Sequence, residues 1–130
     1  MALNDTLSNA LSHILNSEKV GKQSCTIRPY SKLILAVLDV FKENGYIKEY
    51  KVQEITKGGI LEVNLNSSIN KCGAIKPRFS IKKDNFEKFE KRYLPSKNFG
   101  LLLLSTQKGI MSHNQAQKHK IGGRLIAYVY

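Results

Sequence analysis

The chain has 130 residues, 42% of them hydrophobic, and a formal net charge of +11. This length and apolar content allow one compact domain or two small lobes, and they exclude a disordered basic tail. Cys25 and Cys72 are too few for a disulfide framework, and no apolar stretch approaches the roughly 18 residues of a membrane span. The start lacks a basic region followed by an apolar run, so we expect no signal peptide. We predict a cytoplasmic protein without membrane contacts, in which both thiols are reduced and packed.

The positive charge is concentrated in the second half of the chain. Residues 1–65 hold eight Lys or Arg and seven Asp or Glu, whereas residues 66–130 hold thirteen basic and three acidic residues. After Glu90, seven cations follow without a single acid. This asymmetry indicates that the second half builds a surface for a polyanion. The alternative is a lysine-rich surface that only confers solubility, but such surfaces usually intersperse acidic residues.

Apolar spacing in the first half predicts two helices and three strands. The first helix has Asn4 or Asp5 as its N-cap and ends near Lys19, and the second begins after an N-cap at Ser31 and ends at Gly45. The two helices can cover one face of a three-stranded sheet. Its strands are predicted at residues 25–28, 46–55 and 60–65, with a hairpin turn at residues 57–59.

The second half predicts mainly strands, after a loop at residues 66–78. Ser112 and Gln115 fit a capping box that opens a short helix to about Lys120. The predicted fold class is therefore α+β, with an N-terminal α-β-α-β-β lobe at residues 1–66 and a mainly-β C-terminal lobe with a short helix at residues 67–130. The other elements predicted in this lobe are strands at residues 79–82, 100–105 and 124–130 and a short helix or turn at residues 85–92.

The strongest candidate binding site lies in the C-terminal lobe, where a polar loop leaves an apolar strand. Hydroxyls, an amide, an ammonium group and glycine backbone are suited to ribose 2′-OH groups, phosphates and base edges, which indicates RNA as the ligand. The alternative is a solvated turn without a ligand. Binding is favoured if the segment with the paired glycines, Gly122 and Gly123, returns to the same side of the lobe as this loop. The candidate RNA-binding residues here are Ser105, Thr106, Gln107, Lys108, Gly109, Gly122, Gly123 and Arg124.

Weaker candidates lie in the first lobe and near the boundary loop. Arg28, Ser31 and Lys32 surround a helix N-terminus that suits a phosphate, although a capped helix with incidental cations explains them equally well. Two aromatic residues, Tyr128 and Tyr130, can stack on a base, but core packing is the favoured interpretation. The RNA-binding set is completed by Asn4, Lys76 and Arg78, the last two from a basic run with a supporting electrostatic role.

Catalysis finds little support in the sequence. His113 and His119 are six residues apart, so on a helix they do not share a face as a zinc-binding pair does. Cys72 has no neighbouring cysteine, and the chain has no phosphate-binding loop, dinucleotide fingerprint or nucleophile elbow. We predict that the protein is not an enzyme and uses no cofactor, metal or small-molecule substrate. A Cys–His pair assembled in space is the enzymatic alternative.

Two C-terminal strings are the most specific in the chain: Ser105-Thr106-x-x-Gly109-Ile110-Met111-Ser112-His113, and Gly122-Gly123-x-Leu125-Ile126-Ala127-Tyr128-Val129-Tyr130. They occur in order with further strings at residues 5–11, 27–34, 44–47, 69–79 and 94–96. Together these strings closely resemble the small-subunit ribosomal protein family numbered eight, in its archaeal and eukaryotic branch. The resemblance runs nearly from end to end.

The resemblance implies a two-lobe α+β protein that binds the central domain of small-subunit ribosomal RNA, aids assembly and touches neighbouring ribosomal proteins. It also implies that the loop at Ser105, Thr106 and Gly109 reaches an RNA groove. Gln107 departs from the usual second serine, and Arg124 stands where bacterial members carry Glu, so the bacterial contact cannot be carried over. The alternative function is that of a basic nucleic-acid-binding protein or RNA chaperone outside the ribosome.

Overall fold

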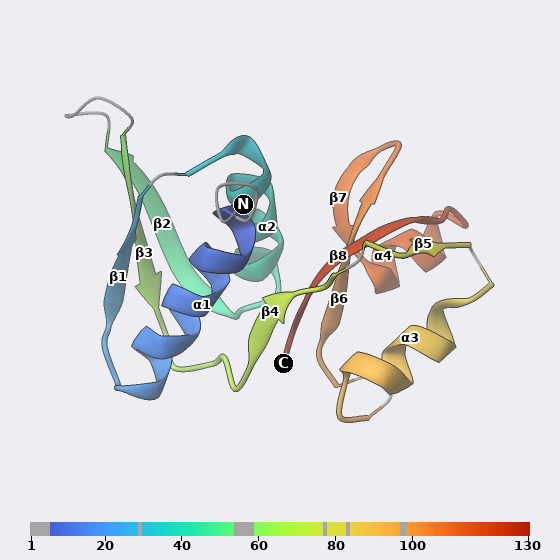
Figure 1. Cartoon of the computed structure of the whole chain (residues 1–130), viewed down its shortest axis with the longest axis horizontal. Coiled ribbons are helices and arrows are strands. Elements are labelled where there is room, and N and C mark those ends of the chain that lie inside the picture. Colours follow the sequence, from blue (N-terminus) through green and yellow to red (C-terminus); the bar gives the residue numbers. More distant parts are fainter. Residues whose placement is uncertain (1–5, 29, 54–58, 77, 83, 97–98) are drawn as a thin grey trace. The chain divides into compact units, whose positions relative to one another are not determined.

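The computed structural model describes residues 6–28, 30–53, 59–76, 78–82, 84–96 and 99–130 (Figure 1). The chain forms two compact units, Met1–Lys71 and Cys72–Tyr130. The division of the chain into domains at residues 66 and 67 stays a prediction. None of the described helices is long and apolar enough to cross a membrane.

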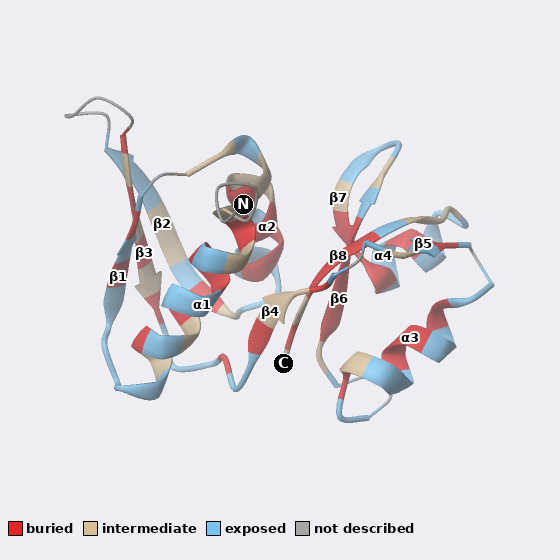
Figure 2. Cartoon of the chain, viewed as in Figure 1, coloured by how far each residue is buried: buried red, intermediate tan, exposed pale blue. Residues whose placement is uncertain are grey.

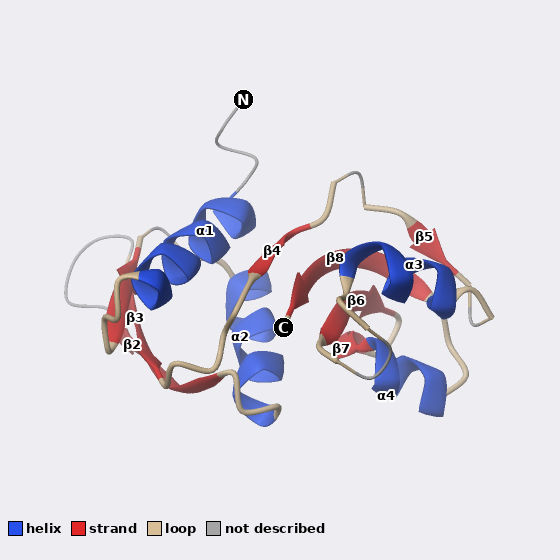
Figure 3. Ribbon diagram, turned by 90° about the horizontal axis from the view of Figure 1, so that it is seen from below, coloured by secondary structure: helices blue, strands red, loops and turns tan. Residues whose placement is uncertain are grey.

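The first unit packs two helices on one face of an antiparallel sheet, as Figure 3 shows. The strand order is β1-β3-β2, so the last strand in sequence is the central one. Along β3 every second residue is buried, as expected for a strand with one face on a core. The elements are α1 (Thr6–Lys19), β1 (Ser24–Ile27), α2 (Lys32–Glu43), β2 (Ile47–Gln53) and β3 (Ile60–Leu65).

Local sequence explains where α2 begins and ends. The hydroxyl of Ser31 accepts a hydrogen bond from the backbone N–H of Ile34 at 3.3 Å, which confirms the predicted N-cap. Gly45 follows the last turn with φ 79°, a conformation that other residues adopt only with strain. The predicted cap of α1 at Asn4 or Asp5 and the turn residues Lys57 and Gly58 lie outside the described residues.

The second unit is built on a five-stranded sheet whose central strands are β8 and β6. The strand order is β4-β8-β6-β7, and β5 also pairs with β8, all antiparallel. The elements are β4 (Cys72–Ala74), β5 (Ser80–Ile81), α3 (Phe86–Tyr93), β6 (Leu101–Thr106), β7 (Gly109–Ser112), α4 (His113–Lys118) and β8 (Gly123–Val129). The predicted α+β class is confirmed, and so are the α-β-α-β-β order of the N-terminal half and the mainly-β character of the C-terminal half with its short helix.

Two elements differ from the sequence-based prediction, and both are short strands. β4 lies inside the segment predicted as a loop, where Gly73 pairs with Tyr128 of β8. β7 follows the polar loop, in a segment for which no strand was predicted, so that loop is the turn of a β-hairpin. In each case the neighbouring strand supplies hydrogen bonds that a three- or four-residue sequence pattern does not reveal.

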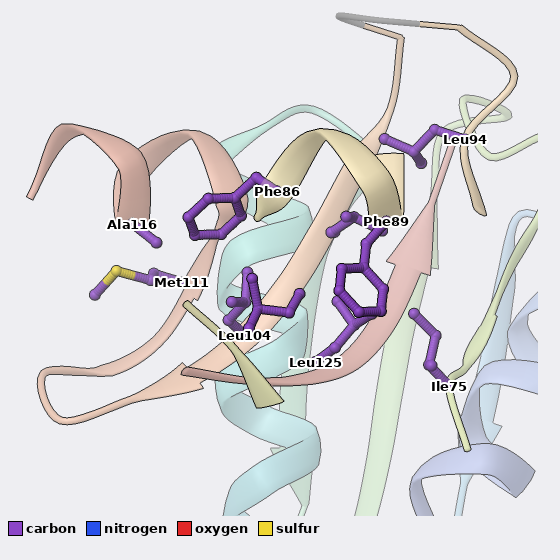
Figure 4. Close-up of a cluster of buried hydrophobic side chains, with 10 residues drawn as sticks. Ile75, Phe86, Phe89, Leu94, Leu104, Met111, Ala116 and Leu125 are labelled. Atoms are coloured by element: carbon purple, nitrogen blue, oxygen red, sulfur yellow. The ribbon is translucent and has the colours of Figure 1, made fainter. Parts of the chain in front are cut away.

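The core of the second unit lies between the sheet and the two short helices. Phe86 and Phe89 of α3 point toward Leu104 and Leu125 of the sheet (Figure 4). Leu101–Leu104 are all buried, so β6 is covered on both faces (Figure 2). Burying each of these large apolar side chains stabilises the fold by about 1.5–3 kcal/mol. A rigid central strand therefore leads directly to the polar residues at its end.

Both cysteines are buried thiols, as predicted. Burial raises the pKa of the Cys25 thiol, which keeps the sulfur protonated and unreactive. In the first unit, Tyr50 of β2 donates a hydrogen bond of 2.6 Å to Asp39 of α2, and this contact raises the pKa of Tyr50 to about 12.

Candidate nucleic-acid interface

The polar loop forms a tight hairpin turn in which Thr106 lies opposite Gly109. The hydroxyl of Thr106 donates to the carbonyl of Gly109 at 2.8 Å and accepts from the backbone N–H of Lys108 at 3.1 Å. Gly109 has φ 112°, which favours glycine at this position. The side chain of Thr106 thus closes the turn and leaves Gln107 and Lys108 exposed at its tip (Figure 2).

A row of polar side chains crosses the sheet beside this turn. Arg124 of β8 is directly opposite Ser105 of β6 on one side and Ser80 of β5 on the other. All three residues are exposed. Directly opposed residues in antiparallel strands project from the same face, with Cβ atoms about 4.5–5.5 Å apart. The row therefore places one guanidinium group between two hydroxyls, and it continues to the half-buried Ile110 of β7.

The paired glycines are required by close packing between strands. A Cβ atom at Gly123 would lie 2.5 Å from the carbonyl oxygen of Ser105 and 2.9 Å from Cγ2 of Thr106. At Gly122 a Cβ atom would collide with the carbonyl oxygen of Ile81. The glycines therefore let β8 begin against β5 and β6, and they bring Arg124 beside the hairpin turn. The expected return of this segment to the loop is confirmed, and strand packing explains both glycines without any ligand.

The second unit, which carries this row, has a large excess of positive charge. Residues 72–130 hold twelve Lys or Arg and three Asp or Glu. Two of these acids have partners: Glu87 lies 3.7 Å from Lys91, and Glu90 faces His113. A surface with such an excess of cations attracts phosphate groups over a distance of about 8–10 Å at ordinary salt concentrations.

His113 does not belong to an exposed site. The residue is 1% exposed, and its Nδ1 atom accepts a hydrogen bond from the backbone N–H of Leu102 at 3.0 Å. Its Nε2 atom lies 3.5 Å from Oε1 of Glu90. Burial lowers the pKa of His113, while the nearby carboxylate of Glu90 acts in the opposite direction. His113 therefore fixes α4 and α3 to β6, a role that no local sequence pattern indicated.

The remaining predicted residues are distributed over both units. Arg28 and Lys32 are exposed in the first unit, where the hydroxyl of Ser31 serves as the helix cap. Asn4 lies outside the described residues. In the second unit, Lys76 is exposed after β4, and Arg78 is exposed two residues before Ser80.

Ser80 is the functional candidate that the sequence analysis missed. It lies in a two-residue strand, and only the register with β8 brings it beside Arg124. Among the described residues, no group of three or more His, Cys, Asp or Glu side chains could hold a metal ion.

The chain matches the model of a known protein family. The family model described as Ribosomal protein S8 matches residues 5–130 of the chain. The matched region includes the hairpin turn, the paired glycines and the polar row in the second unit, and it also includes the helices and strands of the first unit.

Proposed function

The chain belongs to the Ribosomal protein S8 family, and from that premise we propose where and how it binds RNA. Family membership makes it a non-enzymatic protein of the small ribosomal subunit that binds ribosomal RNA and serves translation. The RNA-binding surface that we propose is called the Arg124 surface. It consists of Ser80, Ser105, Gln107, Lys108, Gly109 and Arg124.

The observation that carries this proposal is the exposed row in which Arg124 stands between Ser80 and Ser105. A guanidinium group offers five N–H donors in one plane and can bind a phosphate in a bidentate manner or stack on a base. The two serine hydroxyls can donate to and accept from ribose 2′-OH groups, which are absent from DNA. The row can therefore recognise both the charge and the sugar of RNA.

The turn adds charge and rigidity to the Arg124 surface. Lys108 is an exposed ammonium group at the tip, suited to a phosphate, and Gln107 has both a donor and an acceptor for a base edge. Thr106 acts through the turn, because both of its hydrogen bonds are made to the backbone of Lys108 and Gly109. Gly122 and Gly123 act by bringing β8 against β6.

The finer identity of the RNA and the protein is also part of this proposal. The strings at residues 69–79 and 94–96, together with Arg124 after the paired glycines, support the archaeal and eukaryotic branch. We assign the chain to the central domain of small-subunit ribosomal RNA, with a role in assembly beside neighbouring ribosomal proteins in the cytoplasm. The further residues that we propose to contact the RNA are Asn4, Arg28, Ser31, Lys32, Lys76 and Arg78, the last two in a supporting electrostatic role.

Chemical footprinting of small-subunit ribosomal RNA tests the proposal. The wild-type chain should protect a compact set of central-domain nucleotides, including their 2′-hydroxyls, from cleavage. Arg124→Ala should restore cleavage at a subset of these nucleotides, whereas the exposed α4 variant Lys118→Ala should leave the pattern unchanged. Protection confined to another domain, or an Arg124→Ala footprint identical to wild type, would contradict the proposal.

A further inference from the structure

Four aromatic side chains of the second unit form a continuous series, which we call the aromatic ladder: Phe99, Tyr130, Tyr128 and Tyr93. The ring centroids of successive members are 6.1, 6.3 and 5.9 Å apart. Both tyrosine pairs are stacked, with interplanar angles of 24°. The ladder joins the end of β8 to the end of α3.

Arg92 extends the ladder at its α3 end. Its guanidinium carbon lies 5.4 Å from the ring centroid of Tyr93 and 5.1 Å from that of Phe79, so the cation stands over two rings. Arg92 is exposed and forms no salt bridge with any residue that the structure describes. An aromatic series that ends in an unpaired guanidinium group combines the two features of single-strand RNA platforms, π faces and positive charge.

The ladder covers the edge of the core and remains partly open to solvent. Its three tyrosines are half-buried and pack against the core cluster. Phe99 is 47% exposed, in contrast to the buried Phe86 and Phe89. A phenyl ring that is 47% exposed gives up about half of the free energy that full burial would provide, so packing of the core alone does not explain its position.

We propose that the aromatic ladder is a second RNA contact, on which an unpaired stretch of RNA stacks a base against Phe99 and places a phosphate near Arg92. The charge of this unit favours RNA over a protein segment, because no acidic residue follows Glu90 in the sequence. Stacking on an aromatic ring does not require a particular base, since every base has a π face. This inference rests on the proposed function in taking RNA as the ligand.

The ladder is separate from the Arg124 surface. Tyr128 and Arg124 lie four residues apart on β8, a span of about 13 Å. Tyr128 is opposite Leu102, which belongs to the core cluster, whereas Arg124 is opposite the exposed Ser105. Residues 102 and 105 of a strand project from opposite faces, so the two contacts engage different parts of a folded RNA.

Binding of a ten-nucleotide single-stranded oligoadenylate to the full chain tests the inference, with an abasic strand of the same length as the comparison. Phe99→Ala should weaken oligoadenylate binding by about fivefold to 150-fold and should leave abasic-strand binding unchanged. Phe99→Trp should retain the affinity of the wild type. Arg92→Ala should weaken binding of both strands, because it removes a phosphate contact. Val20→Ala, which truncates an apolar residue that is 69% exposed in the first unit, is the matched control.

The inference is overturned if Phe99→Ala, shown to be folded by its thermal unfolding, binds oligoadenylate as tightly as Val20→Ala does. Equal losses on both strands would also overturn it, because they would exclude base stacking. If Phe99→Ala binds RNA as tightly as wild type but no longer binds a protein partner that wild type binds, the ladder is a protein contact and not an RNA contact. The Arg124 surface is tested in parallel with ribosomal RNA, so failure at Phe99 with a clear effect of Arg124→Ala leaves the proposed function standing.

Discussion

The Nε2 atom of His113 lies 3.5 Å from Oε1 of Glu90, and both side chains are buried. On its other side, the imidazole accepts the backbone N–H of Leu102 through Nδ1 at 3.0 Å. The neutral ring therefore carries its proton on Nε2, facing Glu90. This arrangement joins α3 and α4 to the strand that ends in Ser105, so it supports the Arg124 surface from within the core.

Replacement of His113 should destabilise the second unit. His113→Ala leaves the N–H of Leu102 and the carboxyl of Glu90 buried without their partner, so the free energy of unfolding should fall by about 2–4 kcal/mol. Urea denaturation measures this as a lower midpoint at an unchanged slope. His119→Ala is the control, because His119 is exposed and its loss should change stability by less than about 0.5 kcal/mol. A His113→Ala midpoint equal to that of His119→Ala would show that the buried contact contributes nothing.

The same residue should make stability fall in acid. Burial holds the pKa of His113 below its ordinary value of 6.5, while in the unfolded chain the pKa is near that value. As the pH falls below 6.5, His113 in the unfolded chain takes up a proton before His113 in the folded chain does. The stabilising contribution of neutral, buried His113 is therefore complete above pH 6.5 and is lost as the pH falls toward the pKa of the folded state. The stability of wild type relative to His113→Gln should therefore decrease from neutral pH to about pH 5. A constant difference between the two proteins across this range would contradict the pKa shift.

Close packing at Gly123 leads to a third prediction. Gly123→Ala places a methyl group against the carbonyl oxygen of Ser105 and should destabilise the protein by about 1–3 kcal/mol. Gly21→Ala separates this collision from backbone strain, because Gly21 has φ 78° but open space around its Cα atom. That control should cost about 1 kcal/mol. Thermal unfolding of both variants measures the difference, and a Gly123→Ala protein as stable as wild type would mean that β8 can move away from β6.

Thr106 should act through the shape of the turn. Thr106→Ser keeps the hydroxyl that bonds Lys108 and Gly109, so its affinity for ribosomal RNA should equal that of wild type. Thr106→Ala removes both hydrogen bonds and should weaken binding to the cognate RNA without changing the salt dependence, because no charge is lost. Equal losses on cognate and random RNA, measured by titration, would argue against a role of the turn in selectivity.

Much of the fold could be predicted from the sequence, because its longer elements have a clear periodicity. The helix at α2 has an N-cap, an apolar face and a glycine after its last turn, and all three appear in the structure. The apolar run at Leu101–Leu104 identified the buried strand β6. Each of these signals lies within the element that it specifies, so the element can be identified without knowledge of its distant contacts.

The missing parts depend on contacts between residues far apart in the chain. β4 and β7 have only three and four residues and form because β8 and β6 offer hydrogen bonds. The pairing of Ser80 with Arg124 depends on the register of a two-residue strand, which no sequence pattern fixes. The contact of Glu90 with His113 has the same cause. The sequence therefore identified Ser105 and the cations as candidate RNA-binding residues, but it could not predict that Arg124 lies between Ser80 and Ser105.

The central claim is that the Arg124 surface recognises the phosphate and ribose groups of a folded RNA through Arg124 and its two neighbouring hydroxyls, and that Lys108 adds charge. The most direct test measures the affinity of wild type, Arg124→Ala, Lys108→Ala and Lys118→Ala for a central-domain ribosomal RNA fragment and for random RNA, over a range of salt concentrations. With about five phosphates neutralised, the slope of log affinity against log salt should be roughly −4 for wild type. Lys108→Ala should reduce this slope by about one.

Arg124→Ala should lose more affinity for the ribosomal fragment than for random RNA, by a factor of about 5 to 150. Lys118→Ala lies outside the surface and should weaken both RNAs equally and slightly. Equal losses on the two RNAs for Arg124→Ala, or a loss no greater than that of Lys118→Ala, would contradict the account.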